Sequence, residues 1–224
     1  MRTLGIIALT IALLIGGAVA WYKISYPTYT YRYRMTVEVE VGGKLRSGES
    51  VIEVRIAMQP SGGGIPPYKP HVRGEAVFVD LGEGRNVIAL LAAGPLAADV
   101  NYPDYIVPNL FNVQFENWAT LSDMRGTKEV PLSKLPTFVT FSDLGDPNTA
   151  RVVSPHEFEK VFGPDVHLKR VTIEMLGEGV TRKIKEKISW IGNYTLETIF
   201  ERKLREPERG QGPSMTPGLN LKRE

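Results

Sequence analysis

The most regular hydrophobic pattern in the chain is a strict alternation between residues 29 and 41. Tyrosine, methionine and valine occupy its odd positions, whereas threonine, arginine and glutamate occupy its even positions. A period of two predicts a β-strand with one buried face and one solvated face. Because strands usually run to about 5–6 residues, we expect this long strand to bend or to change sheet partway.

A second alternating run covers residues 52 to 58, after a glycine-containing connection over residues 42 to 48. Two such runs joined by a short loop predict an antiparallel hairpin. Residues 60 to 67, rich in glycine and proline, predict a mobile loop. Strands are also predicted at residues 72 to 81 and 86 to 93. The second of these is nearly all apolar, so it should lie centrally with both faces covered.

From residue 95 to residue 135 the periodicity is lost. Four prolines argue against long elements there, although residues 110 to 124 are compatible with one short helix. Further strands are predicted at residues 138 to 141 and 171 to 175. Between them, the sequence Ser154-Pro155-His156-Glu157 predicts a helix start, with serine as the N-cap and glutamate closing a capping box.

Near the C-terminus, apolar residues recur at helical spacing between residues 180 and 191, and the basic side chains of residues 182 to 187 surround them. This pattern predicts an amphipathic helix, which residues 196 to 204 continue as a second one. A basic amphipathic helix can lie on an anionic membrane surface, but it is more often the solvated side of a packed element. From residue 206 onward, proline, glycine and charge predict a disordered tail.

The N-terminal segment has a different character, because Leu4 to Ala20 contains no charged residue. Together with Trp21 and Tyr22 it gives 19 apolar or aromatic residues, close to the roughly 20 that cross about 30 Å of hydrocarbon. The segment therefore predicts a single-pass transmembrane helix that acts as a signal-anchor. Trp21, Tyr22 and Tyr26 stand where an interfacial aromatic belt would lie.

A cleavable signal peptide is the alternative for this segment. Arg2 forms a short basic start, and Ala18-Val19-Ala20 has the form of a cleavage site. We favour an anchor because Lys23 directly follows the apolar run. The positive charges after the span favour a cytoplasmic domain. A short basic N-terminus, however, begins export signals, and long domains translocate largely regardless of charge. We therefore expect a bacterial inner-membrane protein whose domain is periplasmic.

Composition narrows the possible partners only a little. The chain has 27 Lys and Arg against 25 Asp and Glu, a formal net charge of +2, which is too small to indicate binding to nucleic acid. Cysteine is absent, so disulfides, thiolate nucleophiles and cysteine–zinc sites are excluded. The remaining polar composition is that of an ordinary folded domain.

Residues of the kinds used in functional sites occur, but none forms a recognised motif. They are the glycine run Gly62–Gly64, the histidines His71, His156 and His167, and the oxygen-bearing group Asp143, Asp146 and Asn148. The glycines lack a following Gly-Lys-Ser/Thr. The histidines are isolated, and the third group misses the calcium-loop spacing. No serine lies in a G-x-S-x-G elbow. The sequence thus identifies no catalytic, cofactor-binding or metal-ligating residue.

Four stretches carry a loose family resemblance: TYRYRMTVEVEV (30–41), GESVIEVRI (48–56), RGEAVFVDLGEGRNVIALL (73–91) and LPTFVTFSDLGDPNTARVVSP (135–155). In these stretches the sequence resembles uncharacterised bacterial single-span proteins with an N-terminal anchor and a strand-rich domain. The resemblance implies this architecture. It implies no activity and no site residue.

Together these patterns predict an α+β fold: an N-terminal transmembrane helix, then antiparallel hairpins in a sandwich-like sheet structure, with helices packed late in the chain. The predicted parts are an anchor or signal peptide (1–23), one strand-rich domain (24–205) and a disordered tail (206–224). We expect an envelope protein that binds a protein partner, and we favour a non-enzymatic role for it. One alternative is an enzyme or small-ligand binder with a pocket formed by residues 95–135. Another is a cytoplasm-facing accessory subunit of a membrane complex.

Overall fold

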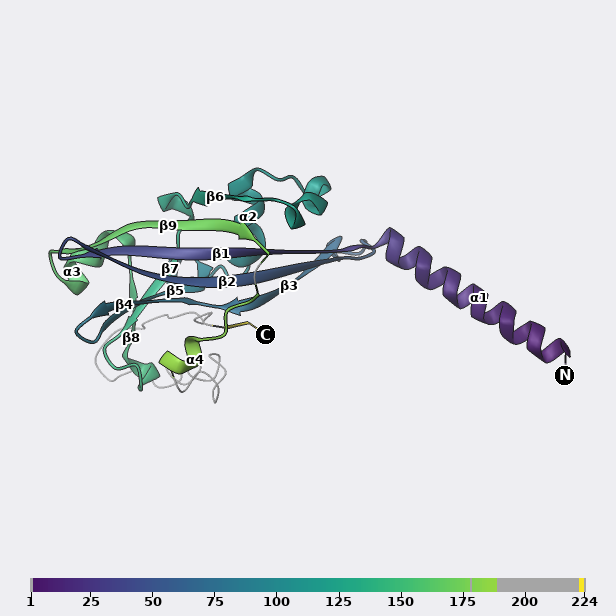
Figure 1. Cartoon of the computed structure of the whole chain (residues 1–224), viewed down its shortest axis with the longest axis horizontal. Helices are drawn as coiled ribbons and strands as arrows, with labels where there is room; N and C mark the ends of the chain where they lie inside the picture. The colour runs from purple at the N-terminus through teal and green to yellow at the C-terminus, as the bar shows by residue number, and fades with distance from the viewer. Residues whose placement is uncertain (1, 178, 189–221, 224) are drawn as a thin grey trace.

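The alternating stretch forms the longest strand pairing of a six-stranded antiparallel sheet, called the large sheet below (Figure 1). The computed structural model describes residues 2–177, 179–188 and 222–223. In it, β1 (Thr28–Val41) pairs with β2 (Lys44–Met58) on one side and with β9 (Val166–Leu176) on the other. The odd-numbered side chains from Tyr31 to Val39 are buried, whereas the even-numbered ones are only partly covered. The predicted strand and hairpin are confirmed.

The large sheet has the order β10-β3-β2-β1-β9-β6, and a second, small sheet has the order β4-β5-β7-β8. The remaining strands are β3 (Tyr68–Glu75), β4 (Val77–Gly82), β5 (Arg85–Ala93), β6 (Gly126–Glu129), β7 (Pro136–Phe141), β8 (Ala150–Val153) and β10 (Lys222–Arg223). The α-helices are α1 (Arg2–Ser25), α2 (Tyr102–Phe111), α3 (Phe158–Phe162) and α4 (Ile184–Lys187). Short 3-10 turns are η1 (Pro95–Ala97), η2 (Phe115–Ser122), η3 (Leu132–Lys134), η4 (Pro147–Thr149) and η5 (Pro155–Glu157). The chain is therefore α+β with antiparallel sheets, as predicted.

One hydrophobic core joins the two sheets. The inner face of the large sheet, including Tyr33 and Ile173, packs in one cluster with Val79 and Leu91 of the small sheet. A second cluster covers the other face of the small sheet, where Ile88 meets Ile184 of α4. β5 thus lies between two strands with both faces covered, which confirms the prediction for residues 86–93.

The long strands differ from the predictions in two ways. β1 does not change sheet, because β2 and β9 follow it on its two sides, and its ladder with β9 has a bulge between Glu38 and Val39. The predicted connection over residues 42–48 is reduced to Gly42 and Gly43, which have φ of 56° and 75°. These positive φ values are those of a two-residue hairpin turn, so β2 begins at Lys44.

The strand predicted at residues 72–81 is divided between the sheets. β3 belongs to the large sheet and β4 to the small sheet, with Ala76 between them. The break begins at Gly74, where φ is 155° and a Cβ atom would lie 2.9 Å from the Ile52 side chain. Only glycine allows β3 to approach β2 so closely at this point, where the chain turns towards the small sheet.

The helix of the irregular region lies earlier than predicted. α2 covers residues 102–111, and η2 takes most of the range 110–124 where a helix was expected. Pro103 fits the first turn, where an N–H is not needed. Pro108 lacks the N–H that would bond the Asp104 carbonyl, and the Tyr31 hydroxyl donates to that oxygen at 3.1 Å instead. The prolines therefore direct this helix onto β1 rather than excluding it.

The predicted helices near the C-terminus are also corrected. Ser154 makes no side-chain cap, so the capping box is absent and the segment starts with η5 before α3. Of the helix predicted over 180–191, the described residues 180–188 form only α4, because Thr181 instead bonds to β2 at Val51. The predicted helix at 196–204 lies outside the described residues. Within the predicted tail, Lys222 and Arg223 pair with β3 as β10.

The predicted transmembrane segment corresponds to α1, which extends away from the sheets at one end of the domain (Figure 1). Within the described residues, however, no helix has the length and apolar character that crossing a membrane requires.

Candidate functional site

The outer face of the large sheet, which points away from the core, carries a group of positive side chains around one carboxylate. The strand registers place Arg32 of β1 opposite Glu53 of β2, and Glu53 opposite Arg73 of β3. Residues opposite each other in antiparallel strands share a face. Arg55 lies two positions along β2 and joins them. We call Arg32, Arg55 and Arg73 with Glu53 the arginine cluster.

Glu53 is the centre of the arginine cluster, and its side chain is only 7% exposed. The Nε and Nη2 atoms of Arg32 both donate to its Oε2 atom, at 2.8 and 2.6 Å. Arg55 and Arg73 approach the other oxygen, Oε1, only at 4.0 and 3.9 Å, beyond hydrogen-bond distance. Arg32 therefore neutralises the carboxylate, while Arg55 and Arg73 add positive charge beside it.

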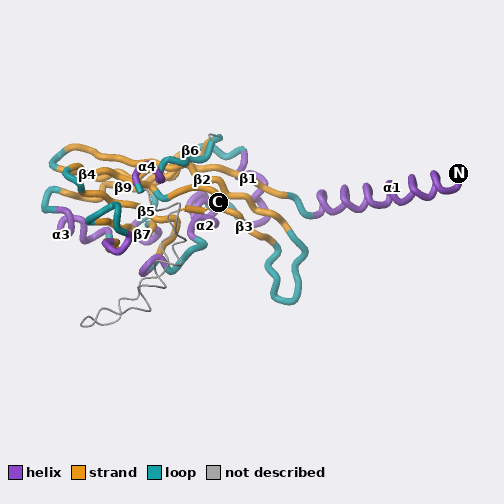
Figure 2. Tube along the Cα trace, turned by 90° about the horizontal axis from the view of Figure 1, so that it is seen from below, coloured by secondary structure: helices purple, strands orange, loops and turns teal. Residues whose placement is uncertain are grey.

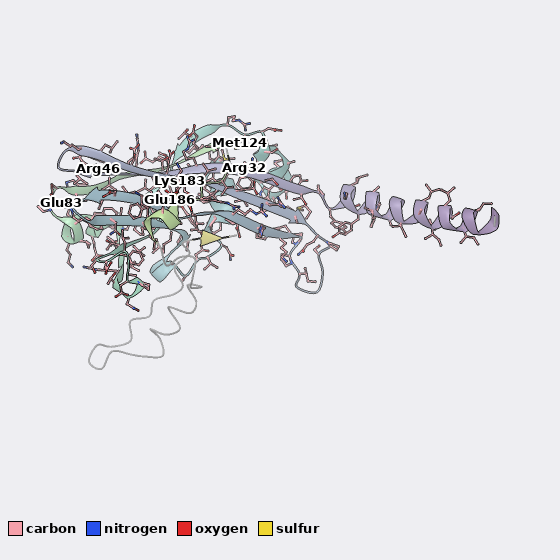
Figure 3. All side chains as sticks on the ribbon, turned by 60° about the horizontal axis from the view of Figure 1, so that its bottom comes forward. Arg32, Arg46, Glu83, Met124, Lys183 and Glu186 are labelled. Carbon is pink, nitrogen blue, oxygen red and sulfur yellow. The ribbon has the colours of Figure 1, made fainter. Side chains whose placement is uncertain are left out.

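The arginine cluster lies on the half of the sheet nearer α1. Figure 3 labels Arg32 on this half and Arg46 at the opposite end. Lys69 extends the positive charge towards α1, because it lies opposite Ala57, two positions from Arg55 on the same face. Lys69 thus adds a fourth positive charge on this half of the outer face.

The other half of the outer face is balanced by one-to-one pairs. Arg170 donates to Glu38 at 2.7 Å, and Lys169 lies 2.6 Å from Glu40. The hydrogen bond to Glu38 and the charge of its carboxylate raise the pKa of Arg170. Between the two halves, Arg34 contacts Glu174 at 2.9 Å. The cations of these three pairs each contact a carboxylate, whereas the arginine cluster gathers three arginines around Glu53.

Most side chains of the outer face are polar, although Val51 of β2, opposite Arg34, is buried there. In the part of the chain that the structure describes, neither hydrophobic cluster includes a side chain from this face of β1, β2 or β3. Arg55 and Arg73 are nearly half exposed. Guanidinium groups in such a setting bind carboxylates in a fork geometry, so the cluster is suited to an acidic surface.

A second group of polar side chains lies where α2 covers the inner face. Tyr31 and Tyr33 of β1 meet Tyr102 and Tyr105 of α2, with Tyr102 and Tyr105 rings 6.0 Å apart. Burial raises the pKa of Tyr31 and that of Tyr102 above the ordinary tyrosine value. Burial and a short hydrogen bond to Asp99 raise the pKa of Tyr105 to about 12. These phenols are held neutral, which suits packing rather than proton transfer near neutral pH.

The irregular region that was considered for a pocket supplies much of this packing. Ile106 and Val107 of α2, Leu121 of η2 and Val130 are all buried in the shared core. At its edge, the rings of Tyr68, Phe115 and Trp118 contact one another with centroids about 5 Å apart. The region therefore closes the end of the sandwich nearest α1.

The residues singled out from the sequence do not come together. The Nδ1 atom of His167 lies 2.9 Å from Glu159, while His71 is on β3 and His156 in η5. No three metal-ligating side chains gather among the described residues. Asp143 and Asp146 accept hydrogen bonds from backbone N–H groups two residues ahead, as in Asx-stabilised turns. Gly62–Gly64 lie in the loop between β2 and β3.

The arginine cluster was missed because its members come from three strands. One signal was available: centring the first hairpin on Gly42 and Gly43 puts Arg32 opposite Glu53. Comparison of the chain with protein-family models, with curated proteins and with solved structures gives no match. The resemblance to single-span proteins therefore stays a prediction.

Proposed function

We propose that the chain is a membrane-anchored, non-enzymatic protein-interaction module that holds an acidic partner protein close to the bilayer. The observation that carries this proposal is the arginine cluster, in which three arginines share one buried carboxylate on an open sheet face. Arg55 and Arg73 offer guanidinium donors that Glu53 does not engage at hydrogen-bond distance. Carboxylates of a partner would engage them in its place.

The anchor in this proposal is α1. Its 24 residues would extend about 36 Å at 1.5 Å per residue, and its leucine and isoleucine side chains, such as Leu9 and Leu13, are more than half exposed. Exposed apolar surface of this extent is unfavourable in water and favourable in lipid. Since no described helix qualifies as a span, the support comes from these exposed side chains and from the uncharged sequence Leu4–Ala20.

The aromatic residues at the end of α1 support an interfacial position there. The Tyr22 and Tyr26 rings have centroids 5.0 Å apart, and the Trp21 ring meets Tyr26 edge-on at 6.5 Å. Such rings favour the boundary between hydrocarbon and water. β1 starts only three residues after α1 ends, so the domain would lie directly above the bilayer with the arginine cluster on its nearer half.

The domain is proposed to be periplasmic, at a bacterial inner membrane. The short basic N-terminus supports this orientation, whereas Lys23 and the arginine cluster oppose it. Compartment-specific reporters fused after Arg205 test it. Activity of the periplasmic reporter is expected, and activity of the cytoplasmic reporter alone would reverse the orientation without affecting the anchor.

In-cell photo-crosslinking tests the interaction itself. A photoreactive residue replaces Thr30, which lies opposite Arg55 on the outer face, and a matched one replaces Thr172 of β9 on the balanced part of the same face. We expect a crosslinked protein of discrete mass at position 30 and a much weaker one at position 172. Equal crosslinking at both positions, or none at position 30, would contradict the proposed surface.

A further inference from the structure

The loop that joins β2 to β3, residues 59 to 67, lies at the end of the domain from which α1 emerges (Figure 2). It is tied to the base of α1, because the Met58 N–H donates to the Pro27 carbonyl at 3.0 Å, two residues after α1 ends. We call residues 59–67 the hairpin tip. Its position follows from the register in which Ala57 lies opposite Thr28 and Met58 opposite Tyr68.

The hairpin tip has the chemistry of a segment that enters a lipid interface. No charged residue occurs from Ile56 to Tyr68, and the first charges on either side are Arg55 and Lys69. Three of the nine residues of the tip are prolines, which carry no N–H group and so leave fewer donors to satisfy in an apolar surrounding. The flanking cations are placed to meet lipid phosphates.

The backbone of the hairpin tip is organised so that it presents one large apolar side chain. Gln59 bonds through its N–H to Pro67 and through its side-chain amide to Pro66, at 3.0 and 2.9 Å. The Ile65 N–H donates to Gly62 at 3.0 Å and closes a tight turn. Ile65 is nevertheless 58% exposed, so the loop is closed by its own hydrogen bonds while its isoleucine faces outward.

The hairpin turn at the opposite end of the domain is flanked by charged residues, unlike the hairpin tip. There the turn at Gly42 and Gly43 is flanked by the charged residues Glu40, Lys44 and Arg46. Leu45 beside this turn is 57% exposed, almost the same as Ile65. An exposed apolar residue therefore occurs at both ends, but only the end at α1 combines it with an uncharged loop.

We infer that the hairpin tip is a second membrane contact, which inserts Ile65 into the interface of the same bilayer that holds α1. The inference rests on the proposed anchor, because α1 brings this end of the domain to the lipid surface. A helix with only a short link to a domain leaves the domain free to tilt. The second contact would fix its tilt, and with it the direction in which the arginine cluster faces.

The absence of cysteine allows a direct test with single-cysteine variants of the full chain. Leu13→Cys, Ile65→Cys and Leu45→Cys are each labelled with an environment-sensitive fluorophore and reconstituted into vesicles of phosphatidylcholine and phosphatidylglycerol. We expect blue-shifted emission and quenching by lipid-borne quenchers at positions 13 and 65, and unshifted, unquenched emission at position 45.

The labels at positions 13, 65 and 45 test the anchor and the second membrane contact separately. Quenching at position 13 without quenching at position 65 would overturn the second contact while the anchor stands. Loss of quenching at both, with protein that does not float with the vesicles, would overturn the anchor and the inference built on it. As a further check, Ile65→Asp in a chain labelled at Lys69→Cys should shift that label's emission towards its value in water, and Leu45→Asp should leave it unchanged.

Discussion

The two faces of the large sheet are made by the same strands but differ in burial and in charge. On the inner face, Tyr33 and Ile173 are completely buried and join the core that holds both sheets together. On the outer face, their immediate neighbours Arg32 and Thr172 are in contact with solvent or with charged partners. Because adjacent residues point to opposite faces, core residues alternate along one strand with residues of the proposed binding surface. Substitutions at neighbouring positions should therefore separate effects on stability from effects on the proposed binding.

The largest difference is expected between Ile173 and Thr172. Ile173→Ala leaves a cavity in the shared core and should lower the free energy of unfolding by about 2–5 kcal/mol. Thr172→Ala removes only an outer-face hydroxyl and methyl group, so its effect should stay within about 0.5 kcal/mol. Urea denaturation of the full chain in mild detergent measures both. Equal losses would mean that the outer face is as tightly packed as the inner one.

The bond between Tyr31 and α2 should give a smaller, coupled effect. Tyr31→Phe leaves the Asp104 carbonyl without the donor that replaces the missing Pro108 N–H, and should cost about 1–3 kcal/mol. Pro108→Ala restores a helical N–H donor to the same carbonyl. In the Pro108→Ala background Tyr31→Phe should therefore cost clearly less. A double-mutant cycle measures this coupling, and strictly additive losses would contradict the role assigned to Tyr31.

The buried tyrosines should also make the inner face sensitive to alkali. The folded-state pKa of Tyr105 is raised to about 12, and that of Tyr31 and Tyr102 is raised as well, against about 10 in an unfolded chain. The unfolded state then loses protons first. The resulting stability is complete below about pH 10 and is lost as the pH rises through the folded-state value. Tyr105→Phe should weaken the fall in urea midpoint between about pH 9 and about pH 11; an unchanged fall would exclude Tyr105 as a source.

The smallest effect on folding is expected at the arginine cluster. Arg55→Ala and Arg73→Ala remove nearly half-exposed side chains that approach Glu53 only loosely, so each should change the unfolding free energy by less than about 1 kcal/mol. Glu53→Gln provides the contrast, because it removes the buried negative charge that pairs with Arg32 and should destabilise more than either. If Arg73→Ala lowered the unfolding free energy more than Glu53→Gln does, Arg73 would have a structural role in the cluster.

Local patterns predicted the parts of the fold that local physics decides. The alternation of β1 and the apolar run of β5 follow from which side chains must be buried, and both strands form as predicted. The break between β3 and β4 depends instead on Gly74 passing close to Ile52, a contact between distant segments. Likewise, α2 tolerates Pro108 because Tyr31 supplies a donor. No spacing within residues 95–135 contains that information.

The candidate site was less predictable than the fold. Its charged members alternate with core residues, so the pattern of each strand alone predicts only an ordinary solvated face. Only the two hairpin registers reveal that Arg32 and Arg73 flank Glu53, and the second register depends on the length of the hairpin tip. The histidines and the aspartate-containing turn, for which the sequence predicted no site, bond to nearby residues: His167 contacts Glu159, and Asp143 accepts from the Gly145 N–H.

The central claim is that Arg55 and Arg73 on the outer face bind an acidic partner and contribute little to folding, and charge reversal at these two arginines tests it most directly. Arg55→Glu combined with Arg73→Glu is placed in the chain that carries the photoreactive residue at position 30, with Arg170→Glu on the balanced half as control. The account predicts loss of the crosslinked partner in the double variant alone, with membrane association kept and an unfolding free energy within about 1 kcal/mol of the parent. Retention of the crosslinked partner in a folded, membrane-associated double variant would contradict it.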